Sequence, residues 1–171
     1  MSDPFRNLSA LYEKVQVHSD RIMDTYSSKF QCRRGCSDCC SSDRSVSAVE
    51  YANVAQALSE VPEKTLSRLK SQPRSKKRCS MLLDGACSVY KARPLICRSH
   101  GLPLVLERSK GRQIVDVCPL NFKDGSLGTL PPEDLLAQGT VDSILVAVNA
   151  LHCQEEGGEP RKRRQLASLL E

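Results

Sequence analysis

Cysteine is the residue type that dominates the chemistry of this 171-residue chain, which contains nine of them. Four form a C-x3-C-x2-C-C cluster: Cys32, Cys36, Cys39 and Cys40. Four more follow at longer intervals: Cys79, Cys87, Cys97 and Cys118. Short C-x2-C spacings let two thiolates reach one ion across a tight turn, and soft thiolates select zinc, copper(I) or iron–sulfur clusters. The sequence therefore predicts that these eight cysteines bind metal, while Cys153 stands apart as a free thiol.

The eight sulfurs suit either two four-sulfur sites or one polynuclear centre, with zinc or an iron–sulfur cluster as the expected cofactor. The neighbours Cys39 and Cys40 are expected to point to different metals, or one of them supports the site rather than ligating a metal. His100 is an alternative ligand close to Cys97. Basic residues near the sulfurs can offset thiolate charge: Arg33, Arg34, Arg44, Arg78, Arg93 and Arg98.

A second motif follows Cys79 and reads C-x2-Y-x2-R-P-x2-C-R, running from Cys87 through Tyr90 and Arg93 to Cys97-Arg98. Together with the first cluster, it resembles the YkgJ-like cysteine-cluster family, the zinc- or iron-chelating CxxCxxCC domain, over about residues 30–120. The first spacing here is three residues rather than the commoner two. Because relatives of the family include flagellin lysine methylases, the resemblance implies an iron–sulfur option. No methyl-donor site is visible in the chain.

The same motif indicates how its residues act. Pro94 fixes a first helical turn, and Cys97 in that turn lies near the positive helix end, which favours its thiolate. Tyr90 and Arg98 are candidates to hydrogen-bond or to balance the charge of a sulfur, the alternative for Tyr90 being core packing.

The expected fold is mostly α: a small helical metal-centred domain with loop-rich cysteine clusters and at most one short β-hairpin. Asp3 and Pro4 can begin a long helix over residues 3–30. Its apolar stripe recurs at helical spacing: Leu8, Leu11, Tyr12, Val15, Ile22, Tyr26 and Phe30. A capping box at Ser47–Glu50 opens a helix that reaches Ser59, and Pro62 starts another that ends near Ser71.

The remaining elements follow the cysteine-rich core, residues 31–120. Segments 102–107 and 112–118 are predicted to form a hairpin through Ser109-Lys110-Gly111. Thr140 can cap a helix over 141–156, with an apolar stripe at Val141, Ile144, Leu145, Val148 and Leu151. Residues 1–156 are predicted to form a single cysteine-cluster domain, and 157–171 a charged tail or peripheral helix.

Several classes are excluded or disfavoured. The longest aliphatic run, 144–148, is far shorter than the ~20 apolar residues of a membrane span. The first residues contain no apolar segment typical of a secretory signal, so we expect a cytoplasmic protein whose reducing surroundings disfavour disulfides. No Ser/His/Asp or paired-carboxylate arrangement is visible, which leaves open whether the chain is an enzyme.

The chain carries 25 basic and 20 acidic side chains, and its basic residues gather in the run 68–78. This run is either a nucleic-acid contact or a solvated loop, and the 4% aromatic content offers little base stacking. Three functions therefore remain open. The first is a cytosolic metal-binding protein. The second is an iron–sulfur protein with redox or methyltransferase-associated activity, and the third is a zinc-stabilised nucleic-acid adaptor.

Overall fold

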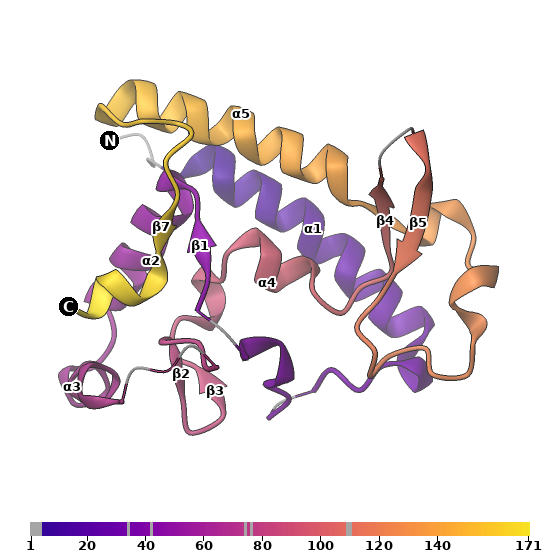
Figure 1. Cartoon of the computed structure of the whole chain (residues 1–171), viewed down its shortest axis with the longest axis horizontal. Helices are drawn as coiled ribbons and strands as arrows, with labels where there is room; N and C mark the ends of the chain where they lie inside the picture. Colours follow the sequence, from indigo (N-terminus) through magenta and orange to yellow (C-terminus); the bar gives the residue numbers. More distant parts are fainter. Residues whose placement is uncertain (1–4, 34, 42, 74, 76, 109–110) are drawn as a thin grey trace. The chain divides into compact units, whose positions relative to one another are not determined.

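The computed structural model is mostly helical with a few short strands in small sheets, as predicted (Figure 1). It describes residues 5–33, 35–41, 43–73, 75, 77–108 and 111–171. The chain forms two compact units, each assembled from segments that are distant in sequence. Unit 1 comprises residues 1–6, 34–94 and 148–171. Unit 2 comprises residues 7–33 and 95–147.

The long helix α1, Arg6–Thr25, supplies most of the first segment of unit 2. The predicted stripe is buried through Ile22, whereas Tyr26 and Phe30 are only partly buried. The helix ends before the predicted residue 30, and Ser27–Lys29 continue as a 3-10 turn. Serine side chains compete for backbone hydrogen bonds, which favours an end at this point. The predicted cap at Asp3 and Pro4 lies outside the described residues.

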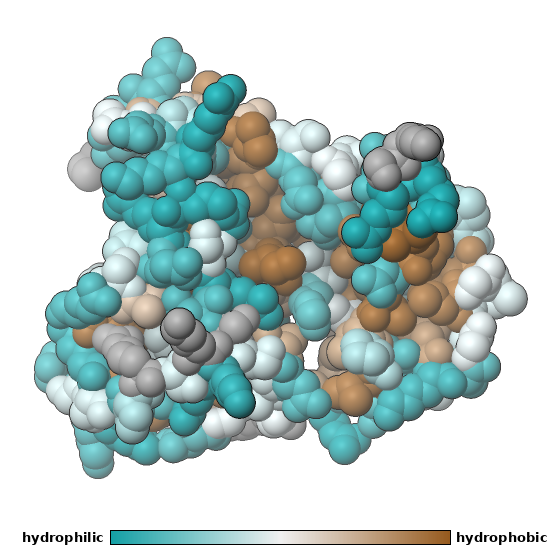
Figure 2. All heavy atoms as spheres, in the orientation of Figure 1, coloured by the Kyte–Doolittle hydropathy of each residue, from teal (hydrophilic) through white to brown (hydrophobic). Residues whose placement is uncertain are grey.

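A three-stranded sheet forms the other part of unit 2. Strands β4, Leu104–Glu107, and β5, Gln113–Asp116, pair antiparallel and confirm the predicted hairpin, although Ser109 and Lys110 of its turn lie outside the described residues. Figure 2 shows hydrophobic residues gathered around the base of this hairpin. Strand β6, Leu136–Ala137, adds in parallel to β4 and was not predicted, because two residues carry no periodicity.

Unit 1 contains the two helices that the sequence predicts to begin at the capping box Ser47–Glu50 and at Pro62. Helix α2 spans Ala48–Ser59, and its capping box is present: the backbone N–H of Ser47 donates to the Glu50 carboxylate at 3.1 Å, and the Ser47 side chain accepts the backbone N–H of Glu50. Helix α3 spans Glu63–Ser71 and is preceded by Pro62. The predicted bounds of both helices are confirmed.

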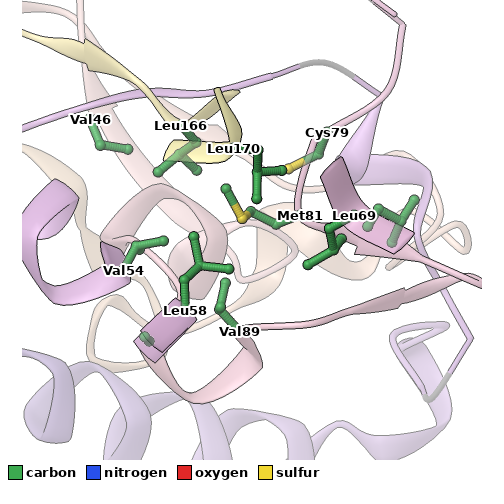
Figure 3. Close-up of a cluster of buried hydrophobic side chains, with 11 residues drawn as sticks. Val46, Val54, Leu58, Leu69, Cys79, Met81, Val89, Leu166 and Leu170 are labelled. Carbon is green, nitrogen blue, oxygen red and sulfur yellow. The ribbon is translucent and has the colours of Figure 1, made fainter. Parts of the chain in front are cut away.

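The core of unit 1 gathers side chains from α2, α3, the loop after Cys79 and the C-terminal segment (Figure 3). Leu166 and Leu170, on the 3-10 helix Leu166–Leu170, are 2% and 3% exposed. Strand β7, Arg164–Gln165, pairs antiparallel with β1, Ser45–Val46. The segment expected as a charged tail or peripheral helix therefore completes the core of unit 1.

Helix α5, Gln138–Glu156, begins before the predicted cap at Thr140 and runs through the boundary between the units. Of its predicted stripe, Ile144 and Leu151 are exposed, at 43% and 49%. The buried face instead includes Asn149, whose oxygen accepts the N–H of Val49 at 3.0 Å and whose nitrogen donates to the carbonyl of Pro160 at 2.8 Å. A buried polar side chain with two partners is invisible to a search for apolar periodicity.

Candidate metal centre

None of the nine cysteines forms a disulfide, and the fold sorts the eight predicted ligands by unit. Unit 1 holds a set that we call the four-thiol group: Cys39, Cys40, Cys79 and Cys87. Unit 2 holds a set that we call the three-thiol group: Cys32, Cys97 and Cys118. Cys36 belongs to unit 1 and is exposed.

Backbone pairing brings the segments of the four-thiol group together. Cys39 and Cys40 lie in the 3-10 turn Asp38–Cys40, and the N–H of Cys79 donates to the carbonyl of Cys40 at 2.8 Å. A second hairpin, beyond the one that the sequence predicted, joins β2, Leu82–Leu83, to β3, Ala86–Cys87, and folds Cys87 back toward this segment. The turn between the strands is Asp84-Gly85, a dipeptide typical of turns, with φ of 50° and 76°.

The thiols of this group act on one another electrostatically. A hydrogen bond with Cys40, followed by burial, raises the pKa of Cys39 well above its ordinary value. Burial is the main cause that raises the pKa of both Cys79 and Cys87, and the charge of a neighbouring thiol adds to each: Cys87 acts on Cys79, and Cys39 acts on Cys87. Cys39 and Cys40 therefore contact each other, and the expectation that they serve different metals stays a prediction.

Two of the predicted arginines lie where they offset this charge. The guanidinium of Arg44 donates to the carbonyl of Cys39 at 2.6 Å, and its charge lowers the pKa of Cys39 and Cys79. Arg93 lowers the pKa of Cys87 and lies over the ring of Tyr90, 3.6 Å from its centroid. Tyr90 is 60% exposed, so it is not part of the core and contacts the arginine that faces Cys87.

Asp43 is a residue of this region that sequence reasoning missed. Its carboxylate accepts the hydroxyl of Ser80 at 2.7 Å and the backbone N–H of Ala167 at 3.0 Å. It thereby links the first cysteine cluster to the residue after Cys79 and to the C-terminal segment. No local pattern in the sequence marks an aspartate whose partners are 37 and 124 positions away.

Two members of the three-thiol group, Cys32 and Cys118, contact a second residue that the sequence did not indicate. Asn121 is 2% exposed, and its side-chain nitrogen lies 3.4 Å from the sulfur of Cys32. Its backbone N–H donates to the carbonyl of Cys118 at 2.8 Å. Cys97 lies on the short helix α4, Leu95–Ser99, directly after Pro94 as expected.

The other candidates have different surroundings. Cys153 is 3% exposed on α5, with its sulfur 4.0 Å from the side-chain oxygen of Asn149. His100 is exposed. Arg98 lies over the ring of Tyr12, 4.1 Å from its centroid. Arg34 lies outside the described residues.

The donor set fits a thiophilic metal, although the sulfurs are not yet arranged as a coordination shell. Within the part of the chain that the structure describes, no three His, Cys, Asp or Glu side chains converge closely enough to hold an ion. A hydrogen bond with Cys40 raises the pKa of Cys39, and burial raises the pKa of Cys79 and Cys87, so both effects favour the protonated thiol. Metal binding would therefore release protons and draw the thiolates together.

Two members of the four-thiol group, Cys79 and Cys87, line cavities. Cys79 lines a cavity of about 760 Å³ together with Asp43 and Arg78. Cys87 lines a second cavity of about 560 Å³ beside Tyr90.

A mostly helical fold in which thiols from distant segments act on one another provides donors that suit a thiophilic metal. The chain belongs to the CxxCxxCC family, described as "Putative zinc- or iron-chelating domain", which matches residues 31–119, about half of its length. No curated protein and no solved structure matches the chain. In the described residues, no helix has the length and apolar character needed to span a membrane.

Proposed function

We propose that this chain is a thiolate metal-binding protein that holds zinc or an iron–sulfur centre. The proposed ligands are the eight cysteines of the two motifs: Cys32, Cys36, Cys39, Cys40, Cys79, Cys87, Cys97 and Cys118. The observation that carries the proposal is the backbone hydrogen bond from Cys79 to Cys40, which brings together two cysteine-bearing segments of the stretch 31–119 that matches the family.

Charge supports a metal at the four-thiol group. Without a cation, four neighbouring thiolates, of which Cys79 is buried and the other three are half-buried, would repel one another and suffer desolvation. One Zn²⁺ or one [4Fe–4S]²⁺ cluster cancels half of that charge, and Arg44 and Arg93 can balance the rest. Because Zn²⁺ and the [4Fe–4S]²⁺ cluster carry the same charge, this charge balance supports a metal centre but does not distinguish between the two.

The three-thiol group is the proposed second centre. Cys97 lies on α4, and Cys32 and Cys118 both lie next to contacts of Asn121. Cys36 is the eighth sulfur of the proposal and is the most accessible of the set. The proposed location is a reducing compartment, the cytoplasm, where thiolates remain available to metal.

An iron–sulfur protein with redox or methyltransferase-associated activity is the second candidate, because the same donors suit that cluster. The third function, a zinc-stabilised nucleic-acid adaptor, has less support. Within the basic run, Arg68 pairs with Asp84 at 2.9 Å, and Arg78 donates to the carbonyl of Leu82 at 3.0 Å. Both cations are thus engaged within the chain, while Arg74 and Lys76 lie outside the described residues.

The test is purification of the full chain without oxygen, followed by elemental analysis and an assay for acid-labile sulfide. A colourless protein with about two zinc ions per chain supports the zinc form. A brown protein with iron and sulfide supports the cluster form. Protein that keeps its full helical circular dichroism and carries neither metal contradicts the proposal.

Single substitutions then identify the ligands. Replacing any of the eight cysteines by serine should lower metal content, since a hydroxyl is a poor ligand for zinc or iron at these sites. Cys153→Ser is the matched control, because Cys153 is also a buried thiol but lies in neither group. Loss of metal in the control, with retention in Cys118→Ser, would show that the eighth ligand has been assigned wrongly.

A further inference from the structure

Asn121 has an amide whose two ends are fixed by backbone partners. Its oxygen accepts the N–H of Gln31 at 2.9 Å, and its nitrogen donates to the carbonyl of Gly101 at 2.8 Å. Only one orientation of the amide satisfies both, since a carbonyl must receive a donor and an N–H must meet an acceptor. At 2% exposure, Asn121 cannot turn toward water instead.

The same nitrogen also faces a sulfur. It lies 3.4 Å from the sulfur of Cys32, while the amide oxygen lies farther away, at 3.9 Å. An amide nitrogen carries two hydrogens, and only one of them is used by Gly101. The second is available to a thiolate, which accepts hydrogen bonds and cannot donate one.

The backbone at Gly101 approaches this sulfur more closely than another residue would allow. Gly101 has a φ of +100°, in the region that favours glycine. A Cβ at this position would lie 3.0 Å from the sulfur of Cys32 and 3.5 Å from the side-chain nitrogen of Asn121. Gly101 and Asn121 therefore form a close-fitting cradle for one sulfur.

This cradle joins the three segments that carry the three-thiol group. Gln31 directly precedes Cys32, and Gly101 follows the helix that carries Cys97. Asn121 closes a turn onto Cys118, to whose carbonyl its backbone N–H donates. One buried amide thus holds together chain segments about 90 positions apart.

We propose that Asn121 is a positioning residue of the three-thiol group, which donates a side-chain N–H to the sulfur of Cys32 and, with Gly101, directs that sulfur toward the metal. This inference rests on the proposed function. An N–H donor to a ligating sulfur orients it and withdraws charge from it, and removal of such a partner typically costs 10- to 100-fold in metal affinity. Asn121 lies outside the stretch that matches the family, so the family's motif does not assign it.

The test titrates the metal-free full chain with Co²⁺ in a reducing, oxygen-free buffer. Asn121→Asp keeps the size of the side chain and an oxygen for Gln31, but it loses both side-chain N–H donors, the one that faces Cys32 and the one that donates to the carbonyl of Gly101. We expect the Co²⁺ affinity of one site to fall 10- to 100-fold and its sulfur-to-cobalt absorption band to shift. The other site should keep its affinity and spectrum, and unchanged binding at both sites would overturn the inference.

A double-mutant cycle separates positioning from a general effect on folding. If Asn121 acts through Cys32, Asn121→Asp should lower affinity in the wild-type chain and have little further effect in the Cys32→Ser chain. Equal fold-changes in both backgrounds would mean that Asn121 only supports the structure, and the inference would then be wrong.

Two glycine variants test the inference if Asn121→Asp fails to fold. Gly101→Ala places a methyl group against the sulfur, whereas Gly125→Ala meets no atom within 4 Å at a comparable φ of +82°. The first should lose Co²⁺ affinity and the second should keep it; equal affinities contradict the inference. If the wild-type chain binds no Co²⁺, zinc or iron, both proposals fail, whereas wild-type binding with unaltered variants removes this inference alone.

Discussion

Cys79 is the residue at which core packing and metal binding can be measured separately. It is 9% exposed and lies in the hydrophobic core of unit 1 among Met81, Leu166 and Leu170 (Figure 3). It is also a proposed ligand of the four-thiol group. Cys79→Ser removes both roles, and the presence or absence of metal tells them apart.

The expected magnitudes follow from its burial and its proposed role. Without metal, a hydroxyl buried in this cluster costs about 1–3 kcal/mol of folding free energy. A structural zinc site contributes on the order of 10 kcal/mol, so an equal share for each of four ligands is about 2–3 kcal/mol. Cys79→Ser should therefore cost about 1–3 kcal/mol in the metal-free chain and about 3–6 kcal/mol in the zinc-loaded chain.

The assay is urea unfolding followed by circular dichroism, with saturating Zn²⁺ and with a chelator, under reducing conditions. Cys153→Ser is the control, because at 3% exposure it introduces the same buried hydroxyl outside both thiol groups. Its cost should be about 1–3 kcal/mol in both conditions. If Cys79→Ser costs the same with and without metal, Cys79 is a core residue only and the reasoning is refuted.

Three further outcomes are expected. Leu166→Ala should lower the free energy of unfolding by about 2–4 kcal/mol in urea, whereas Leu151→Ala, on the exposed side of α5, should cost under about 1 kcal/mol. Asp43→Asn should cost about 1–2 kcal/mol, since its amide cannot accept every hydrogen bond of the carboxylate; an unchanged urea midpoint would contradict this. Because burial raises the pKa of Cys79 and Cys87, the folded metal-free chain holds their protons more tightly than the unfolded chain. The stability of the metal-free chain should be fully present below the ordinary thiol pKa and should fall as the pH rises through 9 and above. The metal-loaded protein should instead lose stability toward acid, because protons compete with the metal for the thiolates. Identical pH profiles for the two forms would count against the proposed ligands.

Local patterns in the sequence were sufficient for the elements whose signals are local. The capping box at Ser47, Pro62 and the Asp84-Gly85 turn each specify their neighbours' backbone directly, and the structure has α2, α3 and the β2–β3 turn where they predict them. The cysteine spacings likewise identified the family. These features depend on residues within a few positions of one another.

Tertiary structure alone decided how the thiols are grouped. The N–H of Cys79 donates to the carbonyl of Cys40, and the side chain of Asn121 contacts the sulfur of Cys32, 89 positions away. Neither contact produces a periodic pattern in the sequence. The same holds for the burial of Leu166 and for Asn149, which sets the buried face of α5. The sequence determines which residues have the chemistry to hold metal. Which of them act together depends on long-range contacts, because burial and hydrogen bonding between distant segments are properties of the folded chain.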